Sequence, residues 1–156
     1  MRDAYQSFPP EPIRRARRKL ERLEKLIEPG FAHLRKLFIE NDCREPKWWE
    51  RHLNGTKTKE QLWDKMTESA FRSQTEYGLM ILAASDRDPY KTIAQPLLDL
   101  YHLKVYKESF CTLGKGSGDI LLPERAIKAL YQIEEFKDAD LEQALKESGF
   151  EEPIDE

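Results

Sequence analysis

Apolar residues near the start of the chain recur at intervals of three and four residues, the spacing of an amphipathic helix. Pro29-Gly30 interrupts the pattern, which then resumes almost in phase. Because tertiary packing can hold a helix kinked at a proline, we expect one kinked helix over residues 11–41, with two separate helices as the alternative. The apolar positions are Ile13, Ala16, Leu20, Leu23, Ile27, Phe31, Leu34, Leu37 and Phe38.

The same spacing predicts further helices along the chain. Thr58-Lys59-Glu60-Gln61 and Asp140-Leu141-Glu142-Gln143 have the sequence of capping boxes, which open helices. Between the two boxes, Asp88-Pro89 and Pro123 indicate helix starts. After the second box, Gly149 indicates a helix stop. Residues 105–113 leave a short strand open as an alternative. The predicted core comprises Leu62, Met66, Tyr77, Ile81, Leu97, Leu130 and Ile133.

These segments predict an all-α fold, an irregular bundle of five to six helices with a long kinked N-terminal helix. We expect a single helical domain over residues 11–150, a flexible lead over residues 1–10 and an acidic tail over residues 151–156. No apolar run approaches the ~18–20 residues that span a bilayer, and the first residues lack the apolar stretch of a secretion signal. A cytoplasmic location without membrane contact is therefore expected.

Charge is distributed unevenly along the 156 residues. Residues 1–60 hold 15 basic and 10 acidic residues, whereas residues 120–156 hold 4 basic and 11 acidic residues. The two oppositely charged ends can attract each other or serve two different partners. The overall net charge is −3 and the pI is near 5.8, which is unlike a dedicated nucleic-acid-binding domain.

The densest basic cluster lies on the first predicted helix and is the leading candidate for binding. Such a helix face can lie along a phosphate backbone or dock onto an acidic protein surface; solvated charge, diluted by nearby Glu residues, is the plain alternative. The seven cations are Arg14, Arg15, Arg17, Arg18, Lys19, Arg22 and Lys25.

A second candidate is the aromatic and basic segment Lys47-Trp48-Trp49-Glu50-Arg51. Adjacent helical residues point about 100° apart, so one of Trp48 and Trp49 can pack while the other lies at the surface. An exposed Trp beside Lys47 and Arg51 would suit an interface anchor or a platform for a base, and two core aromatics are the alternative.

Catalytic and metal-binding signals are weak. The three His residues and the isolated Cys43 and Cys111 lack metal-type spacing, so neither a metal nor a cofactor is indicated. The Gly-rich segment at 114–118 does not have the spacing of a phosphate-binding loop. We do not expect an enzyme.

The sequence therefore favours a non-catalytic helical adaptor, or a small subunit of a larger assembly that can include nucleic acid, docking through the basic N-terminal helix. A protein partner is expected, nucleic acid is a second candidate partner, and a homodimer is compatible. One alternative is a regulator or inhibitor that binds a basic partner through its acidic C-terminal helices. Another is a small enzyme whose site forms only in three dimensions.

Overall fold

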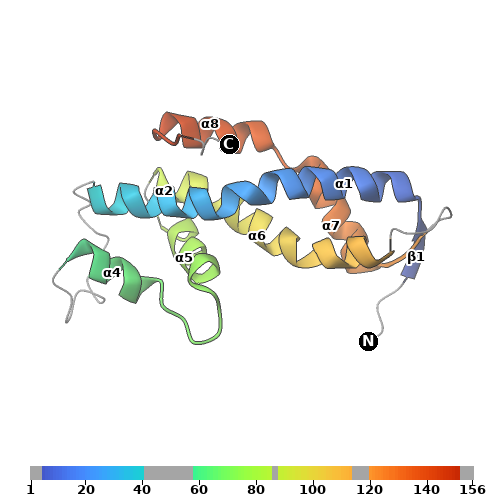
Figure 1. Ribbon diagram of the computed structural model, residues 1–156, viewed down its shortest axis with the longest axis horizontal. Helices are drawn as coiled ribbons and strands as arrows, with labels where there is room; N and C mark the ends of the chain where they lie inside the picture. Colours follow the sequence, from blue (N-terminus) through green and yellow to red (C-terminus); the bar gives the residue numbers. More distant parts are fainter. Residues whose placement is uncertain (1–4, 41–57, 86–87, 114–119, 152–156) are drawn as a thin grey trace. The chain divides into compact units, whose positions relative to one another are not determined.

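A computed structural model describes residues 5–40, 58–85, 88–113 and 120–151, with side chains throughout these ranges except at 106–113. The described residues form six helical segments, with the continuous run from Pro10 to Glu40 counted as one, and one small sheet, which confirms the predicted all-α fold (Figure 1). The chain divides into two compact units. Unit 1 comprises Met1–Ile27 and Asp99–Asp140, and unit 2 comprises Glu28–Leu98 and Leu141–Glu156.

The N-terminal helical run is continuous from Pro10 to Glu40 but changes its winding near the predicted kink. Helix α1 (Pro10–Leu23) is followed by a 3-10 turn, η1 (Glu24–Leu26), and by α2 (Ile27–Glu40). A proline ring within a helix collides with the carbonyl four residues earlier, which for Pro29 is that of Lys25. The 3-10 turn contains Lys25, so the proline accounts for the irregularity.

Unit 1 is built on the packing of α7 (Glu124–Glu135) along α1. The apolar stripe predicted for α1 is fully buried, and α7 buries a matching stripe. At about 25 cal/mol per Å² of apolar surface removed from water, this burial is the main source of cohesion in the unit. The buried residues of the two helices are Ile13, Ala16, Leu20, Leu23, Ala126, Ile127, Ala129, Leu130 and Ile133.

A two-stranded antiparallel ribbon completes unit 1. Strand β1 (Tyr5–Phe8) pairs with β2 (Ile120–Pro123), with Tyr5 opposite Pro123 and Phe8 opposite Ile120. Residues 5–8 of the predicted lead form β1, and residues 1–4 lie outside the described ranges. The two strands are four residues long and more than 100 residues apart, so neither leaves a local signal in the sequence.

Unit 2 has an aromatic core in which helix α4 (Lys59–Met66) packs against α2. The Trp63 ring lies 5.3 Å from the Phe31 ring and 5.4 Å from the Phe38 ring, measured between centroids. All three rings are buried. Offset aromatic pairs add about 0.5–1.5 kcal/mol each beyond the area that they bury, so this cluster is a major stabilising element of unit 2.

Apolar residues at mostly four-residue steps from Leu62 to Ala84 predict one helix after the first capping box, but the structure forms two helices there. Thr58 caps α4 as predicted, and its hydroxyl accepts a hydrogen bond from the Gln61 amide at 3.1 Å. The second helix, α5 (Gln74–Ala83), is capped by Ser73, which accepts from the Glu76 amide at 3.2 Å. Ser73-Gln-Thr-Glu76 is itself a capping box, so the sequence contained a signal for this break.

The break changes which residues of α5 face the core. Tyr77 and Ile81, predicted to be core, are only half-buried, whereas Leu79 and Leu82 are fully buried. The predicted four-residue steps continue across the break between α4 and α5, so they predict the wrong buried face for α5. The other predicted core residues are buried: Leu62, Met66, Leu97, Leu130 and Ile133.

Two glycines allow close helix approach in unit 2. A Cβ atom at Gly78 would lie 2.6 Å from the Phe31 ring, and one at Gly30 would lie 2.8 Å from the Leu97 side chain. Real Cβ contacts of this length are essentially never seen, because atoms at that separation repel strongly. Gly78 is therefore needed for packing against the Phe31 ring, whereas the contact at Gly30 is with a terminal methyl group of Leu97, which can shift.

The remaining helices follow the predicted starts and stops. Helix α6 (Tyr90–Leu113) runs through Pro96, so the strand alternative for residues 105–113 is wrong. Helix α8 (Asp138–Glu147) begins two residues before the predicted capping box. Gly149 ends it with a positive φ of 89°, and the Phe150 amide donates back to the Leu145 carbonyl at 3.0 Å, as in a Schellman motif.

Candidate interaction face on helix α1

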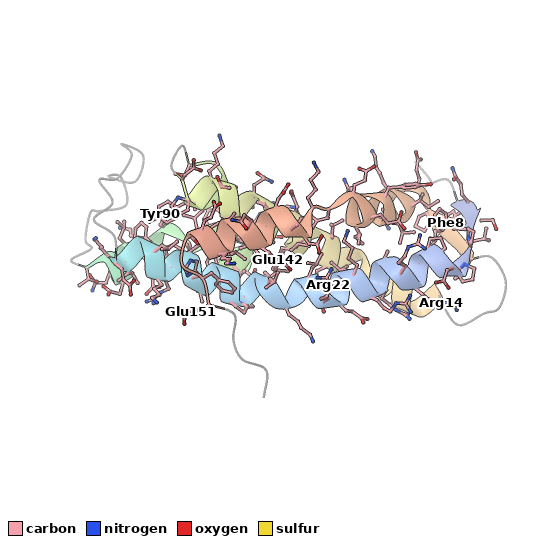
Figure 2. All side chains as sticks on the ribbon, turned by 90° about the horizontal axis from the view of Figure 1, so that it is seen from above. Phe8, Arg14, Arg22, Tyr90, Glu142 and Glu151 are labelled. Carbon is pink, nitrogen blue, oxygen red and sulfur yellow. The ribbon has the colours of Figure 1, made fainter. Side chains whose placement is uncertain are left out.

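The seven predicted cations do not share one set of contacts. Arg15, Lys19 and Arg22 are spaced four and three residues apart and contact the segment from Glu134 to Asp138. We call these three residues the inner row. Arg14 and Arg18 contact Glu11 of the same helix, and we call these two the outer row. Figure 2 shows Arg14 and Arg22 along α1.

Each residue of the inner row makes a contact within unit 1. A guanidinium nitrogen of Arg15 lies 2.9 Å from a carboxylate oxygen of Glu134. The Lys19 ammonium donates to the carbonyls of Glu134 and Phe136, at 3.2 and 3.0 Å. These carbonyls lie at the C-terminal end of α7, where the helix dipole concentrates negative charge. Lys19 therefore acts as a cationic cap of α7.

The third contact of the inner row joins Arg22 to Asp138, the first residue of α8, at 3.0 Å. The hydrogen bond from the Arg22 guanidinium lowers the pKa of the Asp138 carboxyl, with the nearby charge of Lys19 acting in the same direction. The negative charge of Asp138 in the first turn of α8 also interacts favourably with the helix dipole. The oppositely charged ends of the chain thus attract each other, which was one of the two outcomes that the charge gradient left open.

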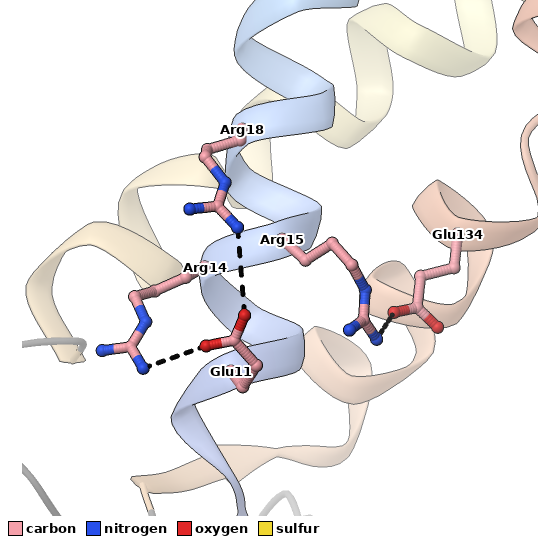
Figure 3. Close-up of polar contacts among 5 residues, drawn as sticks. All are labelled: Glu11, Arg14, Arg15, Arg18 and Glu134. Atoms are coloured by element: carbon pink, nitrogen blue, oxygen red, sulfur yellow. Dashed lines mark hydrogen bonds and ion pairs between the residues drawn. The ribbon is translucent and has the colours of Figure 1, made fainter.

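The outer row has a different environment. Arg14 and Arg18 both approach Glu11, with nitrogen–oxygen distances of 3.1 and 3.9 Å, while Arg15 extends the other way toward Glu134 (Figure 3). Their side chains remain 45% and 68% exposed. Solvent-exposed ion pairs of this kind contribute about 0–1 kcal/mol, so a partner can displace Glu11 at little cost.

The other predicted binding residues have different environments. Lys25 is exposed in η1, and Arg17 is half-buried on α1. The second candidate segment, with Lys47, Trp48, Trp49 and Arg51, lies outside the described residues, as does the Gly-rich segment at 114–118. Their predicted roles stay predictions.

One buried histidine, His33 in unit 2, has polar and aromatic contacts that sequence reasoning did not foresee. Its Nε2 lies 2.8 Å from the Ser148 hydroxyl, and that hydroxyl donates to the Leu145 carbonyl at 2.7 Å. The Ser148 proton is thus directed to a carbonyl, so Nε2 carries a proton and donates to Ser148. Burial lowers the pKa of His33, because desolvation penalises its charged form. This arrangement ties α2 to the end of α8 and does not activate Ser148 as a nucleophile.

A cavity of about 550 Å³ in unit 1 brings a histidine and carboxylates together, as the enzyme alternative requires. It is lined by Asp99, His102 and Glu135, with Leu103, Gln132 and Phe136. The side chains of Asp99, His102 and Glu135 are all exposed.

Metal and membrane chemistry find no support in the described ranges. Within them, no group of three His, Cys, Asp or Glu side chains is placed to hold a metal ion. None of the helices in the same ranges is both long enough and apolar enough to cross a bilayer. Comparisons of this chain with protein-family models, with curated proteins and with solved structures find no match.

Proposed function

We propose that this protein is a non-catalytic helical adaptor, or a subunit of a larger assembly, that docks onto an acidic protein surface through the outer row of α1. The observation that supports this proposal is the division of the cations. Arg15 and Arg22 of the inner row pair with Glu134 and Asp138 elsewhere in unit 1, whereas Arg14 and Arg18 pair with Glu11 of their own helix; all four side chains are exposed. Arg is among the residue types enriched at the centres of protein interfaces.

The same division favours a protein over nucleic acid as the partner. Nucleic-acid affinity grows with the number of phosphates that cations neutralise, and the inner row is already occupied. Glu11 lies between Arg14 and Arg18 and would repel a phosphate backbone, whereas a protein surface can offer it a donor.

A matched pair of variants tests the proposal. Arg14→Gln with Arg18→Gln removes the outer row, and Arg15→Gln with Arg22→Gln removes two residues of the inner row. Each variant loses two positive charges, so a non-specific effect of net charge would be equal in both variants. Affinity purification from native extract should lose the partner with the outer variant and retain it with the inner variant.

The kinetics and a nuclease treatment sharpen this test. With the purified partner, the outer variant should lower the association rate, and the loss should shrink as salt is added. Equal capture by wild type and outer variant would refute docking through Arg14 and Arg18. Loss of wild-type capture after nuclease treatment would instead assign the face to nucleic acid.

A further inference from the structure

The segment that follows α8 is docked on α2 through a buried histidine. The His33 ring is only 9% exposed, and its centroid lies 5.3 Å from that of the Phe150 ring, which it meets edge-on. Its Nε2 donates to the Ser148 hydroxyl at 2.8 Å. Ser148 and Phe150 both come directly after α8, so one titratable side chain of α2 holds two residues of this segment.

The docked segment forms a tight turn at the end of α8. The Ser148 hydroxyl and the Phe150 amide both donate to the Leu145 carbonyl, at 2.7 and 3.0 Å. Gly149, with its positive φ, turns the chain between them. Leu145 itself is 1% exposed, so its side chain anchors α8 without help from this turn. Release of residues 148–150 therefore leaves the rest of α8 packed.

One flank of this turn faces a cavity in place of packed side chains. The cavity has a volume of about 620 Å³ and lies among α2, the start of α6 and the end of α8. A segment that borders a cavity makes fewer dispersion contacts, so opening it costs less than opening the core. The lining residues are Leu37, Asp88, Pro89, Thr92, Ile93, Ala144, Glu147 and Ser148.

The groups around His33 do not offset the cost of burying its charge. Desolvation is the largest influence on its pKa and lowers it, and a hydrogen bond with the Ser148 backbone acts the other way. Lys36 and Glu40 of α2 oppose each other. From the other elements, the carboxylates of Asp88 and Glu147 line the cavity next to Ser148. The net result is a lowered pKa, so a cationic His33 is less stable when docked than in water.

We propose that His33 is an acid-sensitive latch, whose protonation releases residues 148–150 from α2 while Leu145 keeps α8 in place. Release exposes both ring nitrogens to water, which restores the hydration that the imidazolium lacks in the docked state. In the open state His33 regains an ordinary pKa of about 6.5, above that of the docked state. The open population should therefore grow as the pH falls below about 6.5 and stay constant at higher pH.

Amide hydrogen exchange of the full chain at pH 5 and pH 7, corrected for the intrinsic chemical rate at each pH, tests this proposal. The Gly149 and Phe150 amides of wild type should lose protection by about threefold or more in acid. His33→Gln keeps a neutral donor at this position and should abolish the change. His102→Gln removes an exposed histidine of unit 1, is the control and should behave as wild type.

Urea distinguishes release of this turn from unfolding of unit 2. Release exposes little surface, so exchange at Phe150 should hardly respond to urea up to about 1 M, whereas exchange at the buried Leu82 should accelerate. This comparison uses wild type alone, so it decides even where His33→Gln fails to fold. Equal protection of Phe150 at pH 5 and pH 7, an equal acid loss in His33→Gln, or a urea response like that of Leu82 would each overturn the proposal.

Discussion

In unit 2, Trp63 packs between Phe31 and Phe38 at distances of 5.3–5.4 Å between ring centroids. In unit 1, by contrast, the exposed ion pairs of the inner row lie beside the packed α1–α7 core. Close aromatic packing tolerates almost no change of shape. Exposed charges contribute little to stability and can be replaced. The comparison teaches that unit 2 is constrained mainly by packing, while the surface of unit 1 has more freedom to serve a partner.

The largest effect should come from truncating the aromatic cluster of unit 2. Trp63→Ala is expected to lower the free energy of unfolding by about 3–5 kcal/mol, because it leaves a cavity between two rings. Phe71→Ala, in the same unit, removes a side chain that is 96% exposed and should change it by no more than about 0.5 kcal/mol. Urea unfolding measures both, and equal losses would show that Trp63 is not a core residue.

A smaller loss should follow from adding one methyl group in unit 2. Gly78→Ala places a Cβ against the Phe31 ring, which Trp63 blocks from moving, and should cost about 1–3 kcal/mol. Gly149→Ala meets no neighbour within 4 Å but keeps a positive φ, so it should cost only about 1 kcal/mol. A stabilised Gly78→Ala protein would contradict the close helix approach seen here.

The two rows of α1 should differ by less still. Arg15→Gln with Arg22→Gln should lower the free energy of unfolding by about 0.5–2 kcal/mol, since each exposed pair contributes up to about 1 kcal/mol. Arg14→Gln with Arg18→Gln should stay within about 0.5 kcal/mol. Thermal unfolding at low salt measures the difference. Identical curves for the two variants would mean that the inner row contributes nothing to folding.

The smallest expected effects are changes of stability with pH, which fall in different pH ranges for the two units. Burial holds the pKa of His33 below its ordinary value, so protons bind the unfolded state more readily, and stability should fall as pH drops below about 6.5. Lys36 and Glu40 oppose each other near this group. The lowered pKa of Asp138 also makes stability fall with decreasing pH, but this loss begins only when the pH drops below about 4–5.

Two substitutions assign these pH windows to the two units. His33→Gln should remove the loss near pH 6.5, and Asp138→Asn should remove part of the acidic loss and leave the neutral window unchanged. Unfolding free energies measured between pH 3 and pH 8 make the comparison. A wild-type curve that is flat between pH 5 and 7 would mean that burial of His33 does not perturb its titration in solution.

Local patterns determined a large part of this architecture. The three-and-four spacing around Leu20 predicted the buried stripe of α1, Thr58 predicted a helix start, and Gly149 predicted a helix end. Each of these features depends on residues within one or two turns of each other, so a single sequence reveals it. The ribbon of β1 and β2 and the phase of α5 were missed, because distant pairing and an overlooked cap decided them.

The candidate face was predictable only in outline. The sequence by itself placed seven cations on one helix and made the two ends of the chain opposite in charge. Only the tertiary structure brought Glu134 and Asp138, more than 100 residues away, against Arg15 and Arg22, whereas Arg14 and Arg18 contact Glu11 of their own helix. Helical periodicity is local and reads directly from sequence, whereas the choice of ionic partner depends on how helices pack, which is decided by the apolar core as a whole.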